Sequence, residues 1–288
     1  IAKKRAEIVK ENYAMIGGKS PIAELSRQQA DALQDRLRAY YAGMVRVRVE
    51  VGFSYWHPFI AEAMQRLDED GFREVFLMPL YPHYSKTTTG SCFKTWRGIQ
   101  RTRGERRFRV QSVKSYHAHP DYLAAINQRI DEGLRRFPAE RRGEVTLLFS
   151  AHGTPVKLVE QGDPYSKQIG ATVEEVMRLR TDALPYYLSF QSKVGPAKWL
   201  EPDTVIKTEE LARRGVRDML VVPVAFVTDH IETLHELNIE LRHTAEQCGM
   251  RQFEVMPALN DSALYIDALA RQIIERMQRR AQLKDAQR

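Results

Sequence analysis

Residues 67–79, LDEDGFREVFLMP, and residues 211–223, LARRGVRDMLVVP, decide the expected fold. The two stretches align without a gap at a constant spacing of 144 residues. Each has the pattern of a helix that ends at a glycine, a short turn, and a buried strand stopped by proline, which is the second half of a βαβ unit. The repetition predicts two similar domains related by internal duplication. The alternative is chance likeness, because any αβ unit favours glycine at the end of its helix.

Helical and strand-like stretches alternate on both sides of these copies, which predicts an α/β protein with doubly wound parallel sheets. Ser20 and Pro21 fit the start of a helix that Gly43 closes. Leu33 and Leu37 lie on the apolar face of this helix. The strand candidates are residues 45–49, 74–79, 107–113, 145–150, 186–190, 218–224 and 253–257.

The composition is that of a soluble globular protein, with 43% hydrophobic and 28% charged residues. A chain of 288 residues is long enough for two domains of ordinary size. The longest apolar stretch, residues 219–227, is too short to cross a bilayer and no secretory signal opens the chain, so a cytoplasmic location is expected. With only Cys92 and Cys248, neither a disulfide framework nor a four-thiolate cluster site is available.

The net charge of +7 raises the question of an acidic partner. The basic run of the first half lacks interleaved aromatic residues and any zinc-finger or RNA-binding motif, so no nucleic-acid function is expected. A solvated face, or one that touches acidic lipid headgroups, explains the charge more simply. The arginines of this run are Arg97, Arg101, Arg103, Arg106, Arg107 and Arg109.

Ligands of open parallel sheets bind at the carboxyl ends of the strands, which directs attention to the loops after Pro79, Phe149 and Pro223. His152 follows the second of these strands and stands between small residues that let a ligand approach the backbone. A functional interpretation of this histidine competes with a simpler one, a hydrogen-bonded histidine at a strand end.

A second polar group follows the strand that ends near residue 226. Asp229, His230 and Glu232 cluster at the expected N-terminus of a helix, a place that suits ligands. Glu236 and Glu240 continue the acidic face at every fourth residue. A solvated helix surface is the simple interpretation. Imidazole and carboxylate oxygen together also suit ferrous iron or another divalent ion held loosely, or a proton relay.

Several other chemistries are excluded by their missing motifs. His235 and Glu236 lack a second histidine four residues away, which excludes the paired-histidine motif of zinc proteases. The chain has neither a phosphate-binding loop nor a dinucleotide fingerprint, and no nucleophile elbow. Peptidase, nucleotide-driven and serine-hydrolase functions therefore gain no support.

Five motifs in this order and at these spacings resemble those of ferrochelatases, and the resemblance runs from the first residues to about Asn260. It implies two Rossmann-like domains around a cleft, residues 1–118 and 119–260, with residues 261–288 as a C-terminal helix that packs back on the body. The motifs are PLYPHYSKTTTGS (79–91), SAHG (150–153), EQGDPY (160–165), QSKVGP with WL (191–200) and FVTDHIETL (226–234).

The resemblance implies a lyase that inserts ferrous iron into protoporphyrin IX to give protohaem in haem biosynthesis. By resemblance, His152 matches a histidine that ligates iron or accepts pyrrole protons, and Glu232 matches its carboxylate partner across the cleft. His230 is expected to join them in catalysis. The residues expected on a path for metal or protons are Asp229, Glu236 and Glu240. Those expected to bind the porphyrin are Arg5, Tyr13, Ser20, Tyr84 and Ser85.

The substrate suggests a mechanism, because a porphyrin must lose two pyrrole protons and deform before a metal can enter its plane. The hypothesis is that an apolar cleft with Tyr13, Met15 and Tyr84 holds the macrocycle bent. A neutral His152 then takes protons while Glu232 delivers the ion.

The sequence departs from the family pattern in three places. Family members usually begin with an apolar strand, a Gly-Gly-Pro loop and a helical lip, and this sequence starts after all three, which implies an incomplete start of the N-terminal domain. Ser54 stands where many relatives carry arginine, so one anion contact is in doubt. Because no cysteine-bearing tail follows the last helix, no iron–sulfur cluster and no cofactor beyond the substrate Fe²⁺ is expected.

Three alternatives stay open. The nearest is a related chelatase that inserts cobalt or iron into a more carboxylated tetrapyrrole, against which residues 191–199 argue; protoporphyrin is preferred to coproporphyrin from the resemblance alone. The second is a haem or porphyrin carrier, for which a paired His152 and Glu232 would be superfluous. The third, a small-anion receptor, predicts a secretory signal. Oligomeric state and peripheral membrane contact also stay open.

Overall fold

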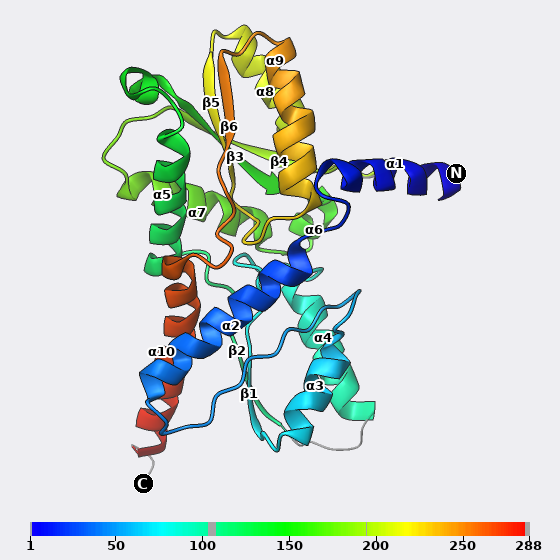
Figure 1. The fold of residues 1–288 in the computed structure, drawn as a ribbon, viewed down its shortest axis with the longest axis vertical. Coiled ribbons are helices and arrows are strands. Elements are labelled where there is room, and N and C mark those ends of the chain that lie inside the picture. The colour runs from blue at the N-terminus through cyan, green and yellow to red at the C-terminus, as the bar shows by residue number, and fades with distance from the viewer. Residues whose placement is uncertain (1, 103–107, 194, 286–288) are drawn as a thin grey trace.

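The computed structural model describes residues 2–102, 108–193 and 195–285, so Arg103, Arg106 and Arg107 of the basic run lie outside the described residues. Two parallel sheets, each with helices around it, form the molecule (Figure 1). The strands are β1 (Glu74–Leu77), β2 (Arg109–Ser112), β3 (Thr146–His152), β4 (Tyr186–Gln191), β5 (Asp218–Pro223) and β6 (Gln252–Val255). The helices are α1 (Ala2–Met15), α2 (Ile22–Tyr41), α3 (Ile60–Glu69), α4 (Thr89–Thr102), α5 (Pro120–Leu134), the 3₁₀-helix η1 (Ala139–Glu144), α6 (Val156–Glu160), α7 (Tyr165–Leu179), α8 (Thr204–Arg213), the π-helix η2 (Glu232–Leu241), α9 (Arg242–Gln247) and α10 (Ala263–Asp285).

The larger sheet has the strand order β4-β3-β5-β6 with every pair parallel. Its central strand β3 is buried on both faces, because Leu147 and Phe149 pack in one hydrophobic core and Leu148 packs in another. Helices α5 and α7 cover the first core, and α8, η2 and α9 cover the second. Burial on both faces explains why these strands are continuous apolar runs rather than alternating ones. The expected α/β class with parallel sheets is confirmed. We call β3–β6 with helices α5 to α9 the second unit.

The smaller sheet consists of β1 and β2, also parallel, and with α2, α3 and α4 it makes up the first unit. The repeated stretches have the same local structure in both units. The N–H of Phe72 donates to the carbonyl of Leu67 at 3.0 Å, and the N–H of Val216 donates to the carbonyl of Leu211 at 3.0 Å. The intervening glycines have positive φ angles of 75° at residue 71 and 95° at residue 215. Each helix thus ends in the same left-handed glycine cap before its strand.

The strand predicted at residues 45–49 is wrong. In the structure, residues 46–52 have no regular secondary structure, although Val47 and Val49 still pack against the main core. Alternation of apolar residues reports which side chains are buried, whereas a strand also requires a neighbouring strand that exchanges backbone hydrogen bonds. The helix before it runs from Ile22 to Tyr41 with Pro21 at its N-cap, and its left-handed cap is Ala42, one residue before the expected glycine.

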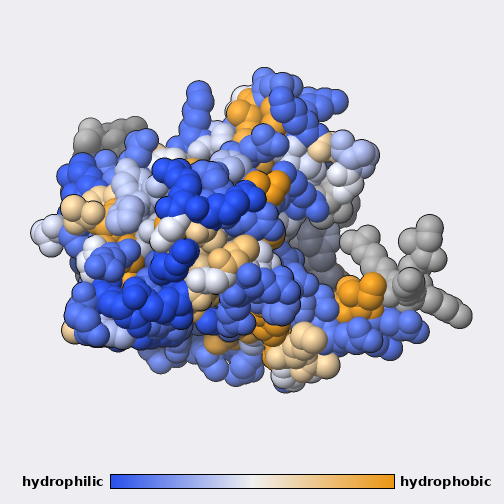
Figure 2. Space-filling model, turned by 90° about the horizontal axis from the view of Figure 1, so that it is seen from above, coloured by the Kyte–Doolittle hydropathy of each residue, from blue (hydrophilic) through white to orange (hydrophobic). Residues whose placement is uncertain are grey.

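Helix α10 joins the two units at one side of the molecule, because it packs against α5 of the second unit and α2 of the first (Figure 1). Helix α1 projects from the other side of the molecule, and the C-terminal end of α1 lies near η2, which it contacts (Figure 1). The face seen in Figure 2 is mainly hydrophilic, with hydrophobic residues in small separate groups. Within the described part of the chain, no helix is long and apolar enough to cross a membrane.

Candidate active site

A cavity of about 1360 Å³ opens where strands of both units end. Apolar side chains of the first unit, such as Leu77 and Phe93, make up much of its wall. Ionisable side chains of the second unit also line it, among them His152, His230 and Glu232. The arrangement matches the expectation that a ligand binds beyond the carboxyl ends of parallel strands.

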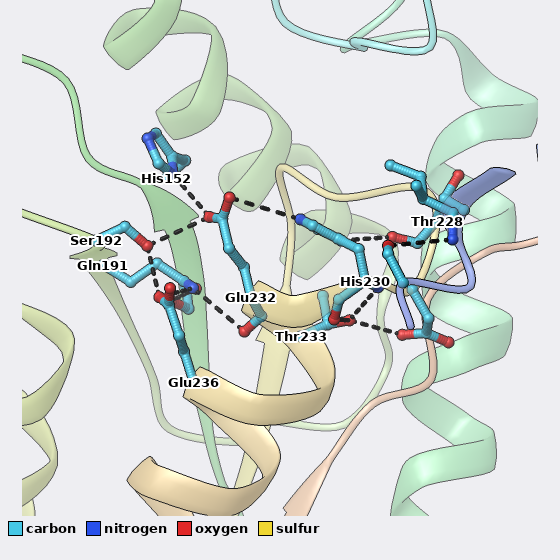
Figure 3. Close-up of polar contacts among 12 residues, drawn as sticks. His152, Gln191, Ser192, Thr228, His230, Glu232, Thr233 and Glu236 are labelled. Carbon is cyan, nitrogen blue, oxygen red and sulfur yellow. Dashed lines mark hydrogen bonds and ion pairs between the residues drawn. The ribbon is translucent and has the colours of Figure 1, made fainter. Parts of the chain in front are cut away.

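His152 and Glu232 both line this cavity. Their side chains point toward one another, as Figure 3 shows. His152 is the last residue of β3, and Glu232 is the first residue of η2, which follows β5. The His152 Nδ1 lies 2.8 Å from the Glu232 Oε2. The other carboxylate oxygen, Oε1, lies 3.7 Å from the Nε2 of His230, whose Nδ1 faces the carbonyl of Thr228 at 2.9 Å. One carboxylate therefore stands between two imidazoles.

The charges of this cluster are coupled. Burial raises the pKa of Glu232, but hydrogen bonding to His152 and His230 outweighs it and lowers the pKa to about 2. Burial lowers the pKa of His152, but the hydrogen bond and charge of Glu232 outweigh it and raise the pKa above its usual value. Both shifts favour the pairing of an imidazolium with a carboxylate. The raised pKa favours the protonated ring, which must release its proton before it can accept another, so a neutral His152 stays a prediction.

Ser192 connects Glu232 to the next acidic residue. Its Oγ lies 3.2 Å from Glu232 Oε2 and 2.6 Å from Glu236 Oε2 (Figure 3). Gln191 also reaches Glu236, at 3.3 Å from its Nε2, and is itself held by the hydroxyl of Ser150 at 2.8 Å. Burial and the neighbouring Glu232 charge raise the pKa of Glu236, although hydrogen bonds from Ser192 and Gln191 oppose the shift. Ser192 has a φ angle of 65°, a left-handed conformation that is uncommon for non-glycine residues.

The acidic helix is a π-helix of ten residues rather than the expected α-helix. Each π-turn takes in more residues than an α-turn, so side chains four apart still fall close to one face. Exposure of the side chains rises along this face from 23% at Glu232 to 59% at Glu240. The carboxylates therefore lead from the cavity towards the surface.

Asp229 does not belong to the series of carboxylates that runs from Glu232 to Glu240. Its two carboxylate oxygens accept hydrogen bonds from the hydroxyl of Thr233 at 2.9 Å and from the amide of Asn260 at 2.8 Å, and its side chain does not line the cavity. Its contacts fix the entry into η2. Among the residues that the structure describes, no group of three or more His, Cys, Asp and Glu side chains forms a candidate metal site.

The predicted porphyrin-binding residues fall in different places. Ser85 lines the cavity, although its hydroxyl donates to Asp163 at 2.9 Å. Tyr13, Ser20 and Tyr84 do not line it, and neither does Met15, which is 63% exposed. The side chain of Arg5 lies outside the described part of the chain. Ser54, at the position of the family arginine, lines the cavity with its Oγ 3.6 Å from the Sγ of Cys92.

Comparison with known proteins decides the family. The family model described as Ferrochelatase matches residues 1–277. The ferrochelatase of Geotalea uraniireducens is 42% identical over 272 residues, which cover 94% of this chain and 82% of that protein. That of Aquifex aeolicus is 39% identical, over 93% of this chain and 83% of that protein. The chain belongs to the ferrochelatase family.

Solved structures support the same fold at much lower identity. SirB from Bacillus subtilis with Fe³⁺ has a TM-score of 0.61 and 13% identity, covering 87% of this chain and 89% of that one. The sirohydrochlorin chelatase SirB from Bacillus subtilis subspecies spizizenii in complex with cobalt has a TM-score of 0.51 and 11% identity, covering 83% and 85%. The expected fold class, with chelatase-like Rossmann-type domains, is confirmed.

Membership of the ferrochelatase family makes the chain a metal chelatase of the lyase class that acts in haem biosynthesis, with a porphyrin and ferrous iron as its substrates. Two residues of the site, Ser192 and Asp163, had no predicted role although both lie in quoted motifs. For Ser192 the available signal was its place directly after a buried strand, at the same sheet edge as His152.

Proposed function

We propose that the porphyrin substrate is protoporphyrin IX and that His152 and Glu232 together carry out insertion of ferrous iron. The single observation that supports this most is their contact at 2.8 Å inside a large, mainly apolar cavity. An apolar cavity suits the faces of a flat macrocycle, and a neighbouring imidazole and carboxylate suit exchange of a proton for a metal ion.

In this proposal, each residue of the site has a separate role in metal insertion. Insertion releases two pyrrole protons for each ferrous ion that enters the ring. Glu232, anionic across the neutral range, binds the incoming ion, while His152 receives pyrrole protons once its own proton has left. His230, 3.7 Å from the same carboxylate, orients it from the other side. Glu236 and Glu240 lead outward from Glu232 and form the route for ion or proton, with Ser192 as the link.

The surroundings of the enzyme also belong to the proposal. We place it in the cytoplasm, with peripheral membrane contact through basic groups near the end of α10, and we expect no iron–sulfur cluster. We divide the chain into residues 1–118, residues 119–260 and the terminal helix 261–288.

An anaerobic assay tests the function. The purified protein is mixed with ferrous iron and either protoporphyrin IX or coproporphyrin, and metalloporphyrin is followed by absorbance. The proposal predicts turnover with a higher kcat/KM for protoporphyrin. Preference for coproporphyrin would contradict the substrate assignment, and stoichiometric porphyrin binding without metallation would instead identify a carrier.

A further inference from the structure

A buried carboxylate lies behind the wall of the cavity and takes no part in the proposed chemistry. Asp163, between α6 and α7, is 3% exposed and does not line the cavity. No Lys, Arg or His in the described part of the chain forms an ion pair with it. A buried anion without a cation depends on neutral hydrogen-bond donors for its stability.

Both oxygens of Asp163 are in use, and they serve different units. Oδ2 accepts from the hydroxyl of Ser85 at 2.9 Å and from the backbone N–H of Lys86 at 2.7 Å, both in the first unit. Oδ1 accepts from the backbone N–H of Tyr165 at 3.1 Å in the second unit. An asparagine has only one acceptor oxygen, so it can satisfy one side of this arrangement but not both.

The groups tied by Asp163 form the cavity wall. Ser85, Thr87 and Thr88 line the cavity from the first unit, and Tyr165 lines it from the second. The hydroxyl of Tyr165 also donates to the backbone carbonyl of His152 at 3.0 Å. Asp163 therefore connects the loop 85–88 to the strand end that carries the reacting histidine.

A second side chain ties the same loop to α7. The Oε1 of Gln168 accepts from the backbone N–H of Tyr84 at 2.7 Å and from the hydroxyl of Ser115 at 3.0 Å. The Nζ of Lys86 donates to the carbonyl of Gln161 at 2.7 Å. Residues 84–86 thus form several hydrogen bonds with the second unit, whereas a connecting loop at the surface is usually mobile.

We infer that Asp163 is a positioning residue that fixes the loop 85–88 as the porphyrin-contacting wall of the cavity. The inference rests on the proposed function, since it assumes that the macrocycle binds in this cavity. Through Ser85 and Lys86, Asp163 sets the distance between the wall of the first unit and the His152 side of the second. Loss of the hydrogen bonds of Asp163 weakens porphyrin binding, whereas the residues that bind the ferrous ion stay unchanged.

The test compares Asp163→Asn with the wild-type protein in anaerobic iron insertion and in binding of protoporphyrin IX followed by fluorescence quenching. The expected result is a rise of about tenfold in both KM and Kd for porphyrin, as losing charge-assisted hydrogen bonds implies, with KM for ferrous iron unchanged. Asp203→Asn is the matched control. The Oδ1 of Asp203 alone accepts both N–H groups at the start of α8, at 2.9 and 3.2 Å, so asparagine keeps these bonds and loses only the ion pair of Oδ2 with Lys193 at 3.7 Å.

A purely structural role would lower the amount of folded, active enzyme and hence the maximum rate, but would leave KM and Kd for porphyrin unchanged, and that result would overturn the inference. If Asp163→Asn fails to fold, Gln168→Leu decides, with the same expected rise in porphyrin Kd and the same contrary result. The binding measurement needs no metallation. A wild-type protein that binds porphyrin but does not metallate it would thus refute the proposed function, while the porphyrin Kd of the variants would still decide the role of Asp163.

Discussion

Replacing Glu232 by glutamine removes one negative charge from the centre of the site and keeps the size of the side chain. A pKa of about 2, against an ordinary 4.5, corresponds to roughly 3 kcal/mol in favour of the ionised carboxylate. The side chain of His152 is 41% exposed, so solvent screens part of this energy. We therefore expect Glu232→Gln to lower the free energy of unfolding by about 1–2 kcal/mol at pH 6.

The pH dependence of this loss follows from the two shifts. Glu232 has a lowered pKa in the fold, so its contribution is present above about pH 4.5 and is lost as the pH falls towards 2. His152 has a raised pKa, so its contribution is full below 6.5 and is lost as the pH rises through the raised value. The difference in stability between wild type and variant should be largest between about pH 4.5 and 6.5.

Urea unfolding at a series of pH values measures the stability, and NMR titration of the imidazole measures the pKa of His152. In Glu232→Gln the pKa of His152 should fall from above 6.5 to below it, because burial then dominates. Glu246→Gln, on the exposed surface of α9, serves as the control and should change neither quantity. A His152 pKa that stays above 6.5 in Glu232→Gln, or a stability difference independent of pH, would refute the ion-pair interpretation.

Three further predictions concern a shared hydroxyl group, a buried histidine and the two repeated glycine turns. Ser192→Ala removes the hydroxyl shared by two carboxylates and should raise KM for ferrous iron about fivefold, the equivalent of one hydrogen bond, with porphyrin KM unchanged in steady-state kinetics. Burial lowers the pKa of His83 to about 3, so unfolding stability should fall as the pH drops from 6.5 towards 3, and His83→Leu should flatten that slope in urea titrations. Gly71→Ala and Gly215→Ala, at φ angles of 75° and 95°, should each cost about 1–2 kcal/mol in thermal unfolding, and a cost at only one of the two would contradict the equivalence of the repeated turns.

The repeat and the strand ends were predictable because their signals are local. Gly71 and Gly215 are needed by the backbone itself, and apolar runs stopped by proline indicate where buried strands end. The position of His152 directly after such a run was enough to place it at the sheet edge where Glu232 also lies. The shared sheet edge of these two residues could be predicted from the sequence, whereas their contact at 2.8 Å is known only from the structure.

Other features depend on contacts with residues that are distant in the sequence, so a local sequence pattern does not predict them. Residues 45–49 alternate like a strand, but pairing depends on a neighbouring strand and not on the residues themselves. A spacing of four residues from Glu232 to Glu240 fits α- and π-helices alike, so the π-helix could not be distinguished. The carboxylate of Asp229 accepts a hydrogen bond from Asn260, and that of Asp163 accepts one from Ser85. Contacts between residues so far apart in the chain produce no local sequence pattern.

The most direct test of the central claim is a double-mutant cycle on anaerobic iron insertion into protoporphyrin, with wild type, His152→Ala, Glu232→Gln and the double variant, each first shown to bind porphyrin. Because His152 and Glu232 act as one unit, we expect each single variant to lose about 10²–10⁴-fold in kcat and the double variant to be little slower than either single one. Near-normal insertion by His152→Ala, or losses that simply multiply in the double variant, would contradict the paired mechanism.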